Sequence, residues 1–457
     1  MKFLYIKKAA VIFTAACMAA CFSISVYAEE TAAESDENTF TDEVLTYKKV
    51  DGGVYISDCN ADVSAVNISK EVDGYAVIGV DSNAFAECEK LTEVILPDSV
   101  QYLGDSVFMG CTALKKVKIP NGITEIPKQT FALCVELVDL ELPDSITTIG
   151  EYAFSYCNDL SWFEIPETVT TIGDYAFAYG VVGETLNIPE GIESLGSLSF
   201  YYCQGLKTVS LPASLSSVGS LAFLGCADLS EYKVADGNTT YTSEYGILYT
   251  ADMTNLVSYP AGKTNEVFNL PDTVQYISDG AFFANTYVSE INLNDSLLTL
   301  GTAAFSNCTS LKYMEIPDSV TELPDSLFCD CTSLREVVIP DSVTTIGPYA
   351  FLECTLLKSL TISNNVTEIG DYALGFTDDE EGNFHKIDDF TVKANFDSQA
   401  KKYAKDNKIS IEYLDGNKDM PYIIALVGAG IVAAAVIAVV IVLVVKKRKN
   451  DKDYYKK

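Results

Sequence analysis

Histidine and tryptophan are almost missing from this chain of 457 residues, which contains one of each, His385 and Trp162. A single histidine counts against Ser-His-Asp or Cys-His catalysis and against zinc sites built on histidine. His385 lies beside an acidic stretch, where a solvated side chain is favoured over a catalytic one. We therefore expect no enzyme activity, no metal site and no cofactor.

Basic residues are the second shortage. The chain has 31 lysines and arginines against 64 aspartates and glutamates, a formal net charge of −33. Binding of nucleic acid needs basic surface that neutralises phosphates, so nucleic acid is excluded as a partner. An acidic surface favours cationic partners, or serves colloidal solubility alone.

The N-terminus has the pattern of a secretory signal peptide. Lys2, Lys7 and Lys8 precede an apolar run over residues 9–26, and Ala28 ends a small-residue cleavage site. An alternative is a lipoprotein signal in which Cys21 is lipidated. In either case, the body of the protein is exported.

An uncharged stretch of 24 residues near the C-terminus, 422–445, is long enough to cross a bilayer. Lys446 to Lys449 follow it directly and are all basic. By the positive-inside rule, these residues place the C-terminus in the cytoplasm and the N-terminal region outside the cell. The sequence therefore predicts a single-pass protein of the cell membrane.

The body of the chain is a repeat of 23 residues, as in the stretch from Ile339 to Ile362, IPDSVTTIGPYAFLECTLLKSLTI. Its proline recurs in register through most of the sequence. The prolines of this series are Pro97, Pro120, Pro143, Pro166, Pro189, Pro212, Pro271, Pro317 and Pro340. A period of this length is typical of a solenoid, in which no coil buries its apolar face alone and neighbours must stack.

Each part of the repeat has a structural interpretation. The segment Leu114 to Ile119 predicts a short strand with its apolar residues inward and the intervening residues outward. Proline closes the strand because it lacks an N–H donor. Ile346-Gly347 predicts a core residue followed by a tight turn. Ala350-Phe351 predicts a short helical or turn segment on the far side of the coil.

Nine of the thirteen cysteines occupy one slot of the repeat: Cys88, Cys111, Cys134, Cys157, Cys203, Cys226, Cys308, Cys331 and Cys354. Stacked neighbours come within disulfide range, but their Cβ vectors run parallel rather than converge. Free cysteine is a small buried apolar residue, and one per coil fits that role. We therefore favour buried thiols over disulfides.

These residues resemble the BspA-like class of leucine-rich repeat proteins of bacterial surfaces. The resemblance rests on the Ala-Phe, Cys, Leu and Ile-Pro slots, on the inserted YGILY…LVSYP segment and on the ending at Ala400 to Ala404. It implies an α/β-type solenoid, a leucine-rich repeat array of about twelve 23-residue coils with a parallel sheet on one face. The expected fold class is therefore this solenoid followed by one C-terminal transmembrane helix. For some relatives the resemblance implies adhesion to host or matrix proteins.

Several positions depart from the pattern and put local packing in doubt. Gly180 and Gly183 replace Cys and Leu, Asn285 replaces Cys, and Leu374 replaces Phe. The glycines are the expected soft spot. The expected parts of the chain are a signal peptide (1–28), an acidic disordered leader (29–44), the solenoid (45–413) with an inserted hairpin (236–270) and a C-terminal cap (377–413), a linker (414–421), the transmembrane helix (422–445) and a basic cytoplasmic tail (446–457).

The outward strand positions are the expected binding face, because solenoids present extended surfaces. The tryptophan lies on this face, and exposed aromatic residues are favoured interface anchors. The candidate ligand-binding residues are Trp162, Glu164, Asp139, Glu141 and Tyr313. A second column of tyrosines, at Tyr156, Tyr179 and Tyr202, is interpreted as self-packing in preference to a ligand platform.

Acidic residues follow most of the prolines, and this column suggests either turn capping or calcium binding; capping is favoured because the glycine-rich calcium repeat is absent. Taken together, the sequence predicts a membrane-anchored surface module that binds an extracellular protein or glycan. The alternative is a structural component of the envelope without a specific ligand.

Overall fold

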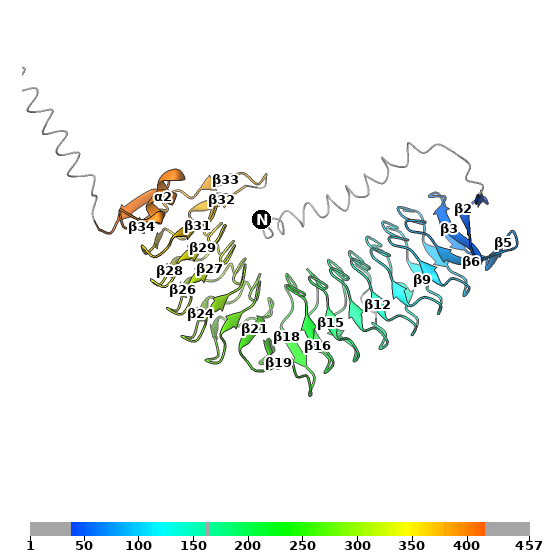
Figure 1. Cartoon of the computed structure of the whole chain (residues 1–457), viewed down its shortest axis with the longest axis horizontal. Helices are drawn as coiled ribbons and strands as arrows, with labels where there is room; N and C mark the ends of the chain where they lie inside the picture. Colours follow the sequence, from blue (N-terminus) through cyan, green and yellow to red (C-terminus); the bar gives the residue numbers. More distant parts are fainter. Residues whose placement is uncertain (1–37, 161–163, 380, 416–457) are drawn as a thin grey trace, which may run out of the picture.

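The regular coils each carry two short strands, and most of these strands pair in parallel with their counterparts in the next coil. The computed structural model describes residues 38–160, 164–379 and 381–415, and shows the coils stacked along a curved path (Figure 1). We call the two rows of strands the primary and the secondary column.

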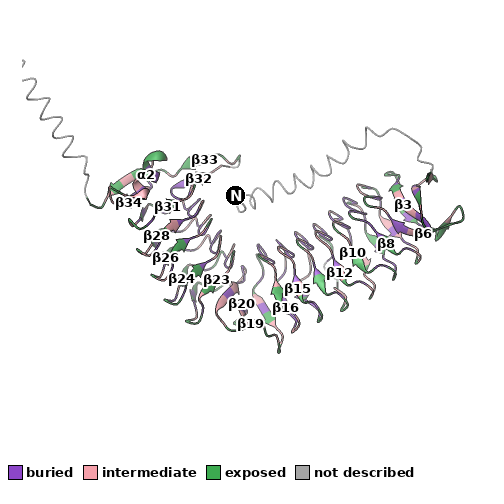
Figure 2. Cartoon of the chain, in the orientation of Figure 1, coloured by how far each residue is buried: buried purple, intermediate pink, exposed green. Residues whose placement is uncertain are grey.

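The primary column contains the strands expected from the repeat. Its pairs are offset by one repeat, as in Asp139 opposite Lys116. Within a strand the middle residue is buried and its neighbours are exposed, as in Lys116, Val117 and Lys118, and this alternation is visible in Figure 2. Its strands are β4 (Ala65–Asn67), β7 (Glu93–Ile95), β9 (Lys116–Lys118), β11 (Asp139–Glu141), β14 (Thr185–Asn187), β16 (Thr208–Leu211), β18 (Glu231–Val234), β22 (Val267–Asn269), β24 (Glu290–Asn292), β26 (Tyr313–Glu315), β28 (Glu336–Val338), β30 (Ser359–Thr361), β34 (Thr391–Ala394) and β35 (Ser410–Tyr413).

The secondary column was not predicted. The isoleucine of the Ile-Gly slot, expected to be a core residue before a tight turn, is also the last residue of a two-residue strand, as where Ile149 pairs with Ile172. Gly150 follows, and a Cβ atom there would lie 2.8 Å from the backbone of Pro127 in the preceding coil. Glycine therefore permits close approach of the stacked backbones. The strands are β8 (Tyr102–Leu103), β10 (Glu125–Ile126), β12 (Thr148–Ile149), β13 (Thr171–Ile172), β15 (Ser194–Leu195), β17 (Ser217–Val218), β23 (Tyr276–Ile277), β25 (Thr299–Leu300), β27 (Glu322–Leu323), β29 (Thr345–Ile346) and β31 (Glu368–Ile369).

The Ala-Phe segment forms turns instead of a helix. Tyr152 and Tyr156 have left-handed backbone angles, φ 56° and 61°, which no helix accommodates. The N–H groups of Tyr152, Phe154 and Tyr156 donate to carbonyl oxygens of the next coil over 2.7–2.9 Å, while the alternate N–H groups bond within the coil. This segment thus adds a third row of hydrogen bonds between coils, which we call the turn column.

The interior is filled by rows of identical side chains. Phenylalanine rings stack from Phe85 to Phe223 with centroids 5.2–5.4 Å apart. A second row runs from Tyr259 to Phe351. The eleven cysteines of the described residues are all free thiols, as expected from the sequence. Eight of them donate from Sγ to the carbonyl oxygen of the phenylalanine in the preceding coil, over 2.9–3.3 Å.

The inserted segment divides the interior into two cores. It forms β19 (Tyr241–Glu244), β20 (Ile247–Thr250) and β21 (Asn255–Ser258), of which the sequence predicted the last two. The side chains of β20 alternate in direction: Leu248 packs in the first core, and Ile247 and Tyr249 pack in the second. The inserted hairpin therefore separates the hydrophobic cores of two stacks of coils.

Both ends of the array carry additional elements. At the N-terminal end, β1 (Thr39–Thr41), β2 (Leu45–Val50) and β3 (Gly53–Cys59) form an antiparallel meander, and β5 (Glu71–Val72) pairs with β6 (Tyr75–Val80). At the C-terminal end, α2 (Gln399–Asp406) covers the last coils. The side chain of Ser398 caps α2 by accepting a hydrogen bond from the N–H of Lys401. The predicted capping helix is thus confirmed.

Two parts of the expected fold class need correction. The array is nearly all sheet, with about 15 turns instead of twelve, and α2 is the single helix of the described residues, so "α/β-type" is wrong. The stretch 422–445, expected to be a transmembrane helix, lies outside the described residues. Within 38–160, 164–379 and 381–415, no helix is long and apolar enough to cross a membrane, so that expectation has no structural support.

Asn285 was expected to weaken packing, and the structure shows the opposite. Its side chain is fully buried, and it makes five hydrogen bonds with backbone groups. The amide nitrogen donates to the carbonyl oxygens of Pro260, Ala261 and Lys263, and the amide oxygen accepts from the N–H groups of Tyr287 and Val288. The asparagine at this cysteine slot therefore joins the inserted segment to the regular coil that follows it.

Replacing Asn285 with alanine is expected to reduce the free energy of unfolding by about 2–4 kcal/mol, because buried backbone groups lose their partners. Urea unfolding followed by circular dichroism measures the change. The exposed Asn292 provides the matched control, and Asn292→Ala is expected to change stability by less than about 0.5 kcal/mol. Equal effects of the two substitutions would show that the bonds of Asn285 do not hold the insertion.

Candidate functional site

The predicted binding residues lie on the exposed face of the primary column. Asp139 and Glu141 are the two outward residues of β11, and both are exposed. Asp139 forms an ion pair with Lys116 of the neighbouring strand, with 2.9 Å between Oδ2 and Nζ. This pair is half-exposed, so it contributes little to stability and leaves Asp139 accessible.

Glu164 is exposed one repeat beyond Glu141, and it borders a groove on this face. The groove has a volume of about 610 Å³. Four carboxylates line it, Glu164, Glu167, Glu184 and Glu190, together with backbone and apolar atoms of residues 182–189. Trp162, the anchor expected from the sequence, lies outside the described residues.

The groove lies at the place where the repeat loses its consensus. Gly183 stands at a leucine slot and lines the groove beside Val182. Gly180 stands at a cysteine slot and is buried; a Cβ atom there would lie 3.1 Å from the carbonyl oxygen of Phe177. The sequence marked these glycines as a soft spot. These departures from the repeat consensus were the one sequence signal that could have located the groove. They could also have indicated Glu184 and Glu190, which line it.

Tyr313 lies on the same face in the second half of the array. In the ladder it stands between Glu290 and Glu336, which occupy the matching positions of β24 and β28. Its hydroxyl donates to Glu315 over 3.1 Å. Partial desolvation, the Glu315 hydrogen bond and the nearby carboxylates raise the pKa of Tyr313. An exposed ring among carboxylates is suited to a cationic side chain, but Tyr313 lies many coils from Glu164.

The tyrosine column of the far side is packed on itself. The rings of Tyr156 and Tyr179 stack with centroids 4.5 Å apart, and Tyr179 and Tyr202 follow at 5.7 Å. Tyr201 is buried among them, and burial raises its pKa above the ordinary value for tyrosine. These rings form a small core of their own, in agreement with the interpretation favoured from the sequence.

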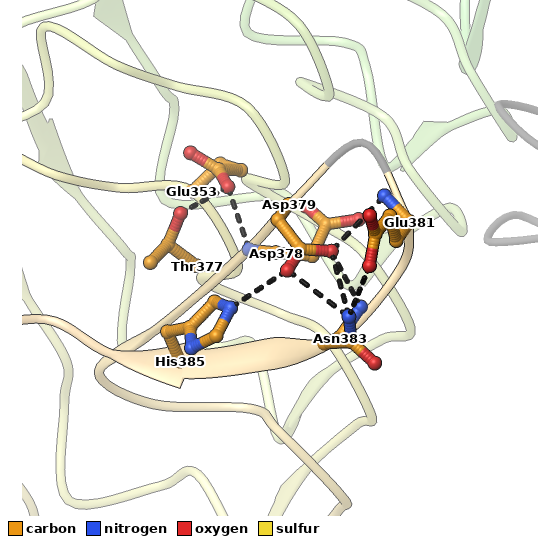
Figure 3. Close-up of polar contacts among 7 residues, drawn as sticks. All are labelled: Glu353, Thr377, Asp378, Asp379, Glu381, Asn383 and His385. Carbon is orange, nitrogen blue, oxygen red and sulfur yellow. Dashed lines mark hydrogen bonds and ion pairs between the residues drawn. The ribbon is translucent and has the colours of Figure 1, made fainter.

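The single histidine belongs to the acidic hairpin of β32 (Phe376–Asp378) and β33 (Phe384–Lys386), shown in Figure 3. His385 is exposed, and its Nε2 lies 2.9 Å from Asp379 Oδ2. The hydrogen bonds from His385 and Asn383 hold the pKa of Asp379 well below its usual range. Thr377 donates to Glu353 of the preceding coil. The contacts in this cluster close the hairpin, and they include no nucleophile paired with His385.

Serine and threonine residues cap the turns of the primary column, one position after the column of acids. Hydroxyl groups there donate to a carbonyl oxygen of the preceding coil over 2.5–2.8 Å, as Ser145 does to Ile123. Within the described ranges, no group of three or more His, Cys, Asp or Glu side chains is arranged to hold a metal ion. The acids themselves remain largely exposed carboxylates.

Comparison with known families decides the relationship of the chain. A sequence profile described as the BspA type leucine rich repeat region matches residues 78–181, 179–257 and 261–379. The chain belongs to this family. The resemblance inferred from the repeat is therefore confirmed, and this BspA-type array joins a family of bacterial surface leucine-rich repeat proteins.

Solved structures agree with the fold of this BspA-type chain. A leucine rich cell surface protein from Faecalibacterium prausnitzii is 28% identical, with a TM-score of 0.65 over 74% of this chain and 96% of that one. The pneumococcal vaccine antigen PcpA is 22% identical, with a TM-score of 0.58 over 82% and 98% of the two chains. The latter likeness concerns the fold alone. A search of curated proteins gives no significant match.

Proposed function

We propose that this BspA-type protein works at the cell surface, where it binds an extracellular partner through the outward face of the primary column. The observation that carries this proposal is the groove at Glu164, which four carboxylates line. The similarity to a cell surface protein of Faecalibacterium prausnitzii supports the location.

The charge of the face favours a basic protein segment over a glycan. Four carboxylates surround the groove, and the chain as a whole carries a net charge of −33. Complementary charge accelerates encounter and fixes orientation more than it adds affinity. The partner is thus expected to present lysine or arginine side chains to the groove.

Reversing the charge of the groove in Glu164→Lys/Glu167→Lys is expected to weaken binding of a lysine-rich decapeptide at least tenfold, because two attractive carboxylates become repulsive. Calorimetry at low ionic strength measures the affinity. The matched control is Asp318→Lys/Asp341→Lys, which changes the net charge equally at two exposed positions far along the array.

If both double variants weaken binding equally, the peptide senses only net charge and the groove is not the site. Capture from host extracellular and bacterial wall material extends the test to natural partners and to glycans. Failure of the unaltered protein to retain any protein or glycan would support the alternative, a structural surface component.

A further inference from the structure

The turn column is broken at one place, where the two cores meet. The N–H groups of Leu221, Phe223 and Gly225 have no hydrogen-bond partner among the described residues. In the preceding coil, the three matching N–H groups donate to this coil over 2.8–3.1 Å. Those donors are Leu198, Phe200 and Tyr202. The coil at 221–225 is therefore bonded on one side of its turn segment and open on the other.

A cavity of about 50 Å³ lies at this break, between residues 218–225 and residues 257–261 and 279–283. Tyr259 borders it and takes the place of phenylalanine in the second aromatic row. The side chain is 2% exposed, and its hydroxyl has no hydrogen-bond partner in the described part of the chain. Such a volume is large enough for a few water molecules. The row of close-packed rings is thus interrupted here.

The strand side of the same junction is closed by hydrogen bonds. The N–H of Tyr232 donates to the carbonyl oxygen of Gly246 over 2.9 Å, and that of Gly262 to Leu229 over 2.7 Å. The hydroxyl groups of Tyr232 and Ser258 lie 3.0 Å apart. β18 and β22 do not pair directly, so the two halves are joined on the strand side through the inserted segment, and they are not joined along the turn column.

Across the open side, the halves meet through apolar side chains. A Cβ atom on Gly280 would lie 2.6 Å from Leu221 and 2.9 Å from Leu224, and glycine permits this approach. Phe283 packs in the same cluster as the two leucines. Apolar contacts of this kind are not directional, so small rotations preserve them. Parting other neighbouring coils requires the loss of three turn-column hydrogen bonds, each worth about 1 kcal/mol.

We propose that this junction is a hinge, at which the two halves of the array rotate about the hydrogen-bonded strand side and open or close the turn side. Regions with few hydrogen bonds and imperfect packing are those that open first. The motion changes the angle between the outward face around Glu164 and that around Tyr313. It thereby adapts a long acidic face to partners of different curvature, an ability beyond binding at the groove itself.

Distances between paired spin labels on the full chain test the hinge. One pair, Ser217→Cys with Glu322→Cys, spans the junction. The other pair, Glu125→Cys with Ser217→Cys, lies within the first half. Both pairs span four steps when β21, which pairs in parallel with β23, is counted between β17 and β23. All three labelled positions are exposed, and Cys329→Ser removes the half-buried native thiol from both proteins. The junction pair is expected to give a distance distribution at least twice as broad as the control pair.

Hydrogen exchange provides the second measurement. The amides of Leu221, Phe223 and Gly225 are expected to exchange at least tenfold faster than their bonded counterparts one coil earlier. Broad distances with fast exchange support the hinge. If the two spin-label pairs give distance distributions of equal width, the hinge is ruled out whatever the exchange rates. Fast exchange without broad distances would show only a static gap in the hydrogen bonding.

Discussion

Raising the pH from about 8 to about 10 in the presence of a reductant is expected to unfold the repeat array. Burial raises the pKa of seven thiols in the cysteine row: to about 12 for Cys308, and in the same direction for Cys111, Cys134, Cys157, Cys203, Cys331 and Cys354. In the unfolded chain these thiols ionise near pH 9. The stabilisation from the neutral thiols is therefore complete below about pH 9 and is lost as the pH rises toward the folded pKa values.

The size of this effect is comparable to the whole stability of a folded domain. Each thiol that ionises only after unfolding lowers the free energy of unfolding by about 1.4 kcal/mol per pH unit above 9. Seven thiols therefore contribute a loss on the order of 10 kcal/mol near pH 10, against a typical stability of about 5–15 kcal/mol. Urea midpoints measured across this pH range give the slope directly.

Cys157→Ser is the control for the thiol assignment, because serine keeps a donor but does not ionise in this range. The variant is expected to lose roughly one-seventh of the slope of stability against pH. A midpoint that stays constant up to pH 10 would contradict the prediction. It would mean that the thiol row is already open to solvent.

Phe154→Ala is expected to reduce the free energy of unfolding by about 3–5 kcal/mol, through lost apolar burial and a cavity in the aromatic row. Phe154 is fully buried and stacks on Phe131 and Phe177, with centroids 5.4 and 5.3 Å away. Each coil contacts only its neighbours, so the loss of stability is expected to be largest in the adjacent coils. Urea unfolding measures the total, and hydrogen exchange measures its spread along the array.

Phe154→Leu separates the cavity from the loss of an aromatic ring. Leucine fills most of the space, so its expected cost is below about 1.5 kcal/mol. A full loss of stability with leucine would show that ring stacking, and not volume, holds the row together. An unchanged midpoint with alanine would contradict the stacked architecture itself.

The sequence predicted those features that a single coil encodes. The inward residues of β9, the hairpin of β20 and β21, and the cap of α2 all follow from local patterns. The secondary column did not, because a strand of two residues such as β12 has no measurable periodicity. Such a segment is a strand only because it pairs with the matching segment of the next coil.

The turn column was hidden for a similar reason. A left-handed backbone conformation is usually signalled in a sequence by glycine or asparagine. In this array, residues such as Tyr152 and Gln129 adopt it. Their conformation is held by hydrogen bonds to a coil 22 residues away. The groove at Glu164 likewise depends on how two irregular coils stack. The glycines signalled the irregularity, but only the structure relates it to the carboxylates.

The three rows of hydrogen bonds all run along the direction in which the coils stack, and this determines how the protein responds to force. A pull between the two ends loads successive coils in series, so neighbouring coils peel apart one after another. Each released repeat of 23 residues lengthens the chain by up to about 75 Å. A partner bound as proposed would thus be held by an extensible array, which lengthens in steps before the binding contact itself is broken.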